Sequence, residues 1–249
     1  MITDPLFYAL AVPAVVLMGI SKGGFAGVGA VSMPLLAMAI SPVQAAAILL
    51  PILIVQDVVS VWAFRRTWDR GVLAVMIPSA AVGILAGYLL AARVSAAAVL
   101  ATLGAISILF AVQRLWAMRG GKVQAPANAP WPLGLLFGAA AGFTSQIAHA
   151  GGPPFQMWVL PKNLAPASLI GTTAIFFAVV NWIKVPAYFA LGQFTRENML
   201  TAAALLPLAI GSTFAGVWLV RRVSADRFYV LIYVLMIPVG IQLIWKALG

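Results

Sequence analysis

The chain has 249 residues, of which 63% are apolar and only 8% are charged. Because a soluble domain carries roughly a quarter charged residues, this composition excludes an ordinary soluble protein and predicts that most of the surface faces lipid. The net charge of +10 is explained by arginines in loops between membrane helices, as the positive-inside rule expects, rather than by a nucleic-acid partner.

Long uncharged runs predict the membrane elements. Each reaches the roughly 18–20 residues that a spanning helix needs, and they are Gly23–Gln56, Gly71–Ala92, Val94–Gln113, Val123–Pro161, Asn163–Ile183, Asn198–Val220 and Phe228–Trp245. The apolar residues are continuous rather than alternating, which excludes a porin-type barrel and predicts an all-α integral membrane protein. The first residues lack the charged start and cleavage site of a signal peptide, so we expect Leu6 onward to be the first membrane element.

In chain order, the sequence predicts two halves of similar design. The first repeat, 1–118, consists of a broken hydrophobic element over 5–40 and helices over 42–64, 71–92 and 95–117. A polar linker rich in Gly and Pro follows over 119–130. The second repeat, 131–249, consists of a broken element over 131–164 and helices over 166–190, 197–220 and 224–247.

Matching spacings indicate that the halves are related. Pro42 begins one predicted helix and Pro166 begins another, and Asp57 and Asn181 each fall 15 positions later. Gly87 and Arg93 in the first half have the same spacing as Gly216 and Arg222 in the second half. The sequence therefore predicts an internal duplication.

Each broken element has a Gly-rich interruption followed by a piece of roughly ten residues, which at ~1.5 Å per residue reaches only about halfway across the bilayer. A re-entrant hairpin of two half-helices fits these lengths, and a hairpin plus three crossings inverts the second half relative to the first. A single kinked span for each element is the alternative, and it gives parallel halves.

The loop charges favour inversion. The inverted arrangement places ten cations on one side of the membrane and three on the other, whereas single kinked spans give eight and five. The first distribution follows the positive-inside rule more closely and puts the linker in the cytoplasm. The two sets are Arg65, Arg66, Arg70, Arg114, Arg119, Lys122, Lys162, Arg221, Arg222 and Arg227, against Arg93, Arg196 and Lys246.

The glycine clusters in the two broken elements predict the binding site. Interrupted helices at matching places in two repeats are typical of transporter sites, because free backbone N–H groups and helix dipoles attract anions there. Ser32 is expected to cap the helix that follows the first cluster. Helix packing is the alternative role for small residues. The clusters contain Gly23, Gly24, Gly27 and Gly29 in the first half, and Gly151 and Gly152 in the second.

Two ionisable residues lie beside the clusters, where such residues are costly and mark functional sites. Lys22 is a candidate for the positive charge that selects an anion, and the alternative is a lysine snorkelling from a helix end. His149, the single histidine, is a candidate for ligand binding or for proton uptake near neutral pH, and the alternative is a hydrogen-bonded structural group.

Further polar residues lie on the helices that follow. Asp57 is a candidate for a coupling proton or cation, and the alternative is a structural partner of Lys22 or an arginine. Asn181 occupies the matching position in the second half. Lys184, three residues later on the same helical face, either adds positive charge to the site or reaches the membrane interface. The neutral binding candidates include Gln146 and Gln156.

No enzyme signature appears. A phosphate loop, HExxH and Gly-x-Ser-x-Gly are all missing, so we predict no catalytic residue, no metal and no cofactor. Most aromatic residues fall near predicted helix ends, as in an interfacial belt. Trp158 and Trp182 are expected to lie deeper, where packing is the simplest role.

Three segments carry a family resemblance: Gly19-Ile-Ser-Lys-Gly-Gly-Phe-Ala-Gly-Val-Gly, Ser41-Pro-Val-Gln-Ala-Ala-Ala-Ile-Leu-Leu-Pro and Ala148-His-Ala-Gly-Gly-Pro-Pro-Phe-Gln. With them the chain resembles the sulfite exporter TauE/SafE family, also called the four-toluene-sulfonate uptake permease family. The resemblance implies a multi-pass carrier of the bacterial inner membrane whose substrate is sulfite, an organosulfonate or a related small anion.

The sequence and the resemblance together predict a secondary transporter that works by alternating access, with the site between the two broken-helix tips. The expected partners are a small anionic substrate, a coupling proton or cation handled by His149 or Asp57, and the lipid bilayer. The alternatives are a passive, channel-like anion pathway and a non-transporting membrane scaffold subunit.

Overall fold

The computed structural model describes the chain except for residues 26, 92, 94, 121–129, 163, 221, 223–225 and 249, and except for the side chains of 226–229, 231, 232 and 235. All regular structure in the described residues is helical, which confirms the predicted all-α fold. The predicted linker lies mostly outside the described residues, as does the predicted helix start at 224.

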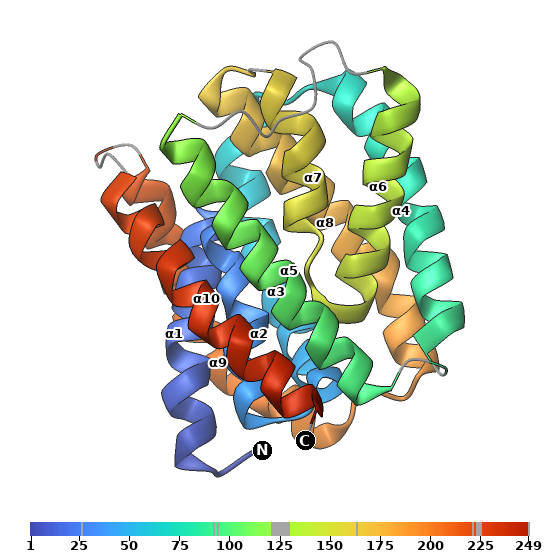
Figure 1. Ribbon diagram of the computed structural model, residues 1–249, viewed down its shortest axis with the longest axis vertical. Helices are drawn as coiled ribbons and strands as arrows, with labels where there is room; N and C mark the ends of the chain where they lie inside the picture. The colour runs from blue at the N-terminus through green and yellow to red at the C-terminus, as the bar shows by residue number, and fades with distance from the viewer. Residues whose placement is uncertain are drawn as a thin grey trace.

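Figure 1 shows the helices in chain order, from blue at the N-terminus to red at the C-terminus. Six of those in the described part, α1, α3, α4, α5, α8 and α9, are long and apolar enough to cross a membrane. The elements are α1 (Pro5–Lys22), η1 (Val28–Val31), α2 (Ser32–Ala39), α3 (Pro42–Phe64), α4 (Arg70–Ala91), α5 (Ala96–Met118), α6 (Trp131–Ala148), α7 (Gly152–Val159), η2 (Leu160–Lys162), α8 (Pro166–Ala190), α9 (Arg196–Leu219) and α10 (Asp226–Leu248).

Local sequence sets many helix ends. Proline occupies the first position of α1, α3 and α8, where its missing N–H costs nothing. Asp4, Ser41, Ser95 and Thr195 each accept a backbone N–H bond as N-caps. After Lys22, Gly24 and Gly27 adopt φ values of 132° and 101°, which glycine tolerates without strain and which do not continue a helix.

Two short helices fold back along the helices that precede them. Ser32, at the start of α2, donates a hydrogen bond to the carbonyl of Ala14 in the middle of α1. In the second half, the ring of Trp158 on α7 lies against Gly134 near the start of α6. Within these two segments the chain therefore reverses direction, after Lys22 in the first and after Ala148 in the second.

Two pairs of helices run parallel in close contact. Gly23 of α1 lies against Gly216 of α9, with Gly19 four residues earlier against Ser212. Likewise α4 packs beside α6 (Figure 1), where small residues let the backbones approach. There Gly142 lies against Ala80, and Gly138 lies against Met76 and Ser79.

Two other pairs run antiparallel. Asp57 and Phe64 of α3 meet Asn181 and Gly171 of α8, in reverse order along the two helices. Similarly α5 crosses alongside α10 in Figure 1, with Gly104 beside Ile244. The start of α1 and the end of α10 lie at the bottom of Figure 1, whereas α6 begins at the top.

The outer surface is apolar, as expected for a face in lipid. Its large side chains include Trp182, which is 59% exposed although the sequence predicted a deeper position. The expected packing role was wrong because Asn181 bonds to α3 and Lys184 bonds to α6, so the neighbouring Trp182 points outward. Trp158, in contrast, is buried.

Candidate functional site

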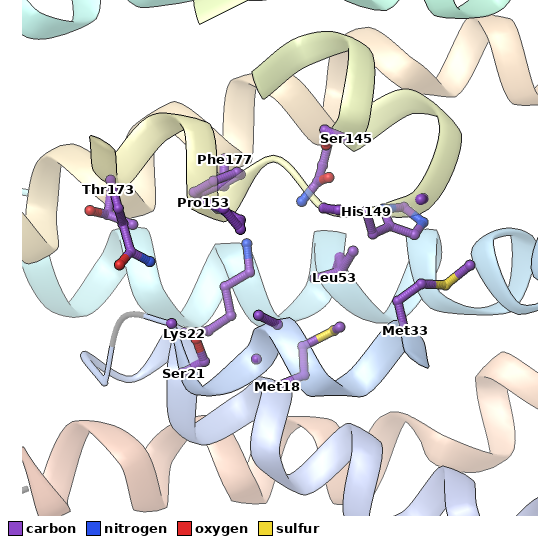
Figure 2. Close-up of a pocket in the computed structure, with 18 of the residues that line it drawn as sticks. Met18, Ser21, Lys22, Met33, Leu53, Ser145, His149, Pro153, Thr173 and Phe177 are labelled. Atoms are coloured by element: carbon purple, nitrogen blue, oxygen red, sulfur yellow. The ribbon is translucent and has the colours of Figure 1, made fainter. Parts of the chain in front are cut away.

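A cavity of about 110 Å³ lies between the two places where the chain reverses, and it has room for several water molecules. We call these places the first turn (Gly23–Gly27, between α1 and η1) and the second turn (His149–Gly151, between α6 and α7). Residues of α3, α5, α8 and α10 complete the walls. Figure 2 shows side chains from both turns converging on it.

Lys22 supplies the charge that reaches the cavity. It is the last residue of α1, its backbone carbonyl accepts a hydrogen bond from Ser60, and its side chain extends toward Phe177 and Pro153 (Figure 2). The ammonium lies 5.1 Å from the centre of the Phe177 ring, which is a cation–π contact. Lys22 is 13% exposed and lines the cavity, so the ammonium is available to a small ligand.

The same ammonium forms an ion pair behind the cavity wall. Lys22 Nζ lies 2.5 Å from Asp57 Oδ1, and Asn181 Nδ2 donates to Asp57 Oδ2 at 2.6 Å. Each carboxylate oxygen therefore has its own donor, one from α1 and one from α8. Asp57 is 2% exposed and, unlike Lys22 and Asn181, does not line the cavity.

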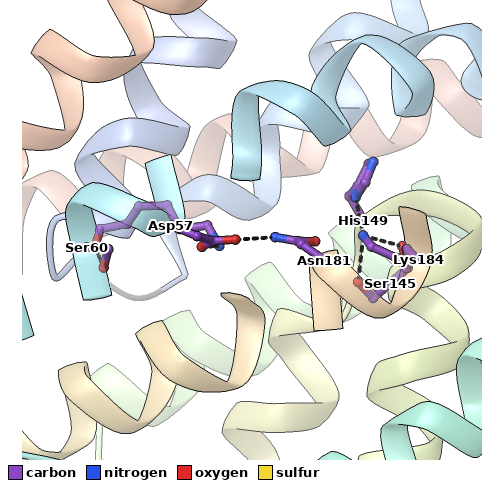
Figure 3. A network of polar contacts seen from close by, with 7 residues as sticks. Asp57, Ser60, Ser145, His149, Asn181 and Lys184 are labelled. Carbon is purple, nitrogen blue, oxygen red and sulfur yellow. Dashed lines mark hydrogen bonds and ion pairs between the residues drawn. The ribbon is translucent and has the colours of Figure 1, made fainter. Parts of the chain in front are cut away.

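A second polar cluster surrounds Lys184, whose side chain is fully buried. Its Nζ lies 3.2 Å from the Ser145 carbonyl, 3.1 Å from Ser145 Oγ and 2.7 Å from His149 Nδ1. Figure 3 shows this cluster on the opposite side of Asn181 from Asp57. Lys184 does not line the cavity, so it does not contact a ligand there directly.

His149 has both ring nitrogens engaged. Nε2 lies 2.9 Å from the carbonyl of Ala46, which can only accept, so this nitrogen carries the proton. Nδ1 lies 2.7 Å from Lys184 Nζ, and an ammonium at Lys184 donates to it and leaves the ring neutral. His149 is also the single non-glycine residue with positive φ in the described part of the chain, at 50°, and it ends α6 in the left-handed conformation.

The structure divides the predicted glycines into two groups. Gly24, Gly27, Gly29 and Gly152 line the cavity. Gly23 and Gly151 do not, and each lies against backbone of another helix or of α6, Gly23 on Gly216 and Gly151 on the Ala141 carbonyl. For these two residues, close packing explains the glycine.

Ser32 does not cap α2. The N-cap is Val31, and Ser32 donates its hydroxyl hydrogen to Ala14 instead. The expectation was wrong because a 3₁₀ turn, η1, precedes α2 and already carries the chain in helical conformation through Val31. Ser32 therefore ties α2 to α1 and lies outside the cavity lining.

The start of α7 offers few free donors. Pro153 and Pro154 carry no N–H, and Phe155 N–H bonds to the Gly151 carbonyl. Among the N–H groups that begin α7, only those of its opening glycines remain available. The second turn thus offers fewer N–H donors to an anion than an ordinary helix start does. The positive charge of Lys22 is correspondingly more important for attracting an anion.

The two glutamines of the second half have different positions. Gln156 lines the cavity, whereas the buried Gln146 packs against Gly87 of α4 and lies outside the lining. Each has a buried side-chain carbonyl oxygen without a hydrogen-bond partner.

Several lining residues were not singled out by sequence. Ser60 follows Asp57 by three positions on α3, and Phe177 precedes Asn181 by four positions on α8. Extending the helical period from Asp57 and Asn181 would have found both. On α8 the lining residues Ile170, Thr173, Ala174, Phe177 and Asn181 form one such stripe. The lining residues Leu103, Ile106 and Ser107 of α5 carry no comparable signal.

Comparison with known proteins gives one match. The model of the family described as Sulfite exporter TauE/SafE matches residues 11–243. No curated protein and no solved structure matches the chain.

Proposed function

The chain belongs to the sulfite exporter TauE/SafE family, whose members are membrane transporters, and we propose that it carries a small anion by alternating access. It is a multi-pass membrane protein. The proposed substrate is sulfite, an organosulfonate or a related sulfur-containing anion. The proposed location is the bacterial inner membrane, with the Arg-rich ends of α3 and α5 in the cytoplasm.

The observation that carries the proposal is the position of Lys22. Its ammonium enters a cavity formed where two chain reversals meet, and no other lysine in the described part of the chain lines this cavity. The remaining polar side chains of the lining carry hydroxyl, amide or imidazole groups, and they are Ser21, Ser60, Ser107, Ser145, His149, Gln156, Thr173 and Asn181. One accessible cation among neutral hydrogen-bonding groups suits a small anion.

The helix packing supports two inverted repeats, each a hairpin plus three crossing helices. If α1–α5 corresponds to α6–α10, the parallel contact of α1 with α9 corresponds to that of α6 with α4. The central pairs α3–α8 and α5–α10 then join equivalent helices, and both pairs are antiparallel. Equivalent helices run antiparallel when one repeat is inverted relative to the other.

Alternating access would follow from movement of one repeat against the other around the cavity. The bond between Asp57 and Asn181 and the bond between Thr67 and Ala167 cross this boundary. Because the lining comes from both repeats, a small rotation would change which side of the membrane the cavity faces.

Binding can be tested with purified protein by thermal shift against sulfite, sulfate, thiosulfate, taurine, ethanesulfonate and small carboxylates. A ligand that binds the folded state raises the melting temperature. The double variant Lys22→Gln/Asp57→Asn should lose this shift, and it leaves no buried charge unpaired, unlike Lys22→Gln alone, which costs about 3–5 kcal/mol. Lys162→Gln, which removes a lysine held over the Trp158 ring outside the cavity, should retain the shift.

Transport itself distinguishes the alternatives. In liposomes, saturable uptake that is accelerated by unlabelled substrate on the opposite side supports a carrier, whereas linear flux without counterflow would indicate a channel-like pathway. Specific binding without any flux would indicate a scaffold. The convergence of polar groups between the repeats, rather than on a lateral face, favours transport over the scaffold.

A further inference from the structure

Among the side chains that the structure describes, Asp57 is the one carboxylate in the interior of the helix bundle. The chain has five acidic residues, and the other four lie at the ends of helices or just outside them: Asp4, Asp69, Glu197 and Asp226. A carboxylate within the membrane is costly, and it commonly marks a proton or ion pathway.

The geometry makes Asp57 a competitor of any anion that binds Lys22. The Asp57 carboxylate forms its ion pair with the Lys22 ammonium behind the cavity wall, whereas a ligand would approach the same ammonium from within the cavity. Binding would therefore bring a second negative charge close to Asp57, whose own side chain is 2% exposed. Like charges that share a buried site disfavour full ionisation of both groups.

Apart from Lys22, the charged or titratable groups near Asp57 are bonded to other partners. Lys22 approaches from α1, Asn181 and Lys184 from α8, and His149 from the second turn. Lys184 has three acceptors of its own, and both nitrogens of His149 are engaged. Neither needs to change partner when an anion enters, whereas the Lys22–Asp57 pair does.

We propose that Asp57 takes up one proton when the substrate anion binds Lys22, so that anion and proton occupy the transporter together. This inference rests on the proposed anion transport. In the step, the Lys22 ammonium exchanges Asp57 Oδ1 for an oxygen of the substrate, and Oδ1 binds a proton from water. Oδ2 keeps its hydrogen bond from Asn181. Proton uptake thus belongs to Asp57 and not to His149.

Proton uptake can be measured by titrating the detergent-solubilised full chain with ethanesulfonate and with sulfite in buffers of different ionisation enthalpy. The wild type should take up about one proton more per bound anion than Asp57→Asn does. Taking the difference between the two proteins cancels the protonation of sulfite itself. Asparagine has nearly the same shape as aspartate, and its single oxygen can still accept from Asn181, which leaves the Lys22 ammonium without its counter-ion and available to the anion. Asp57→Asn, once its folded state is verified by size-exclusion chromatography, should therefore bind the anion at least as tightly as the wild type.

Two matched variants localise the proton. Asp69→Asn alters a carboxylate outside the cavity, which caps Val72, and should take up as many protons as the wild type. Whatever affinity His149→Gln retains, its proton uptake per bound anion should equal that of the wild type. Equal uptake by Asp57→Asn and the wild type would overturn the proposal, and so would loss of uptake in His149→Gln alone. If the anion binds but the wild type takes up no more protons than Asp57→Asn does, the proton coupling is overturned and the proposed anion transport stands. Absence of binding by both probes in the wild type would overturn the two proposals together.

Discussion

Asn181 Nδ2 donates a hydrogen bond of 2.6 Å to Asp57 Oδ2, and each residue stands 15 positions after the proline that begins its helix. The two side chains thus meet from matching places in two antiparallel helices. One is charged and the other neutral, so the contact is favourable where two aspartates would repel. This difference between the halves is what allows α3 and α8 to join through a buried polar bond.

Replacing Asn181 with leucine should destabilise the protein. The variant leaves Asp57 Oδ2 buried without its donor, which costs about 1–3 kcal/mol. Unfolding in detergent, followed by intrinsic fluorescence, measures the loss. Trp182→Leu, at the next position but on the outer surface, serves as the control and should unfold near the wild-type temperature. Equal stability of the two variants would contradict the importance of the bond.

Gly23→Ala should weaken the contact between α1 and α9. The φ of Gly23 is −70°, so alanine fits the backbone, but its methyl group would overlap the backbone of Gly216. Overpacking of this kind costs about 1–3 kcal/mol. Gly211→Ala on α9 is the control, because no heavy atom lies within 4 Å of the added methyl. It should be neutral or slightly stabilising in the same unfolding assay.

The cavity wall predicts a preference for anions with an apolar body. Met18, Met33, Leu103 and Met236 line it together with Ile106. In a series from methanesulfonate to hexanesulfonate, each added CH₂ that enters the cavity should tighten binding about fourfold, from ~0.8 kcal/mol per buried CH₂. Affinity should level off once the chain fills the space. Titration calorimetry gives the slope.

Two variants of α5 show whether the dependence of affinity on chain length arises in the cavity. Ile106→Thr should reduce it, whereas Leu109→Thr, on the same helix but 70% exposed on the outer surface, should not. Affinity independent of chain length would mean that the protein holds the anionic group alone, which would point to sulfite over organosulfonates.

Cysteine accessibility should separate two adjacent positions on α8. The chain has no cysteine, so a single introduced thiol gives an unambiguous signal. Thr173 lines the cavity, whereas Thr172 is fully buried and bonded to the backbone of Asp69. Thr173→Cys should react with a small maleimide, and a bound anion should slow the reaction. Thr172→Cys should react slowly with or without the anion. Similar rates for both thiols would show that water does not reach the cavity.

Much of the architecture follows from the sequence because membrane helices obey strong local rules. The charge-free runs predict the all-α fold, and the prolines at 42 and 166 begin α3 and α8 as expected. The pairing of Lys22 with Asp57 was among the alternatives, because two opposite charges in an apolar interior need each other.

The roles of single small residues were harder to predict because their partners are distant in sequence. Gly23 looks like its neighbour Gly24, yet it packs on Gly216 while Gly24 lines the cavity. Ser32 has the composition of a cap, but the preceding 3₁₀ turn removes the need for one. For His149 the sequence left both a ligand-binding role and a hydrogen-bonded structural role open, and in the structure both of its nitrogens have partners on other elements.

The shortness of α2 and α7 has a consequence for biogenesis. Each has eight residues, about 12 Å at 1.5 Å per residue, less than half the ~30 Å hydrocarbon thickness. Neither segment can enter the bilayer alone as a stable span. For α7, the prolines at 153 and 154 also prevent fusion with α6 into one long helix. Its burial depends on packing against α6 and on α8, whose Phe176 stacks on Phe155, so α7 has its full set of neighbours only after α8 has been synthesised.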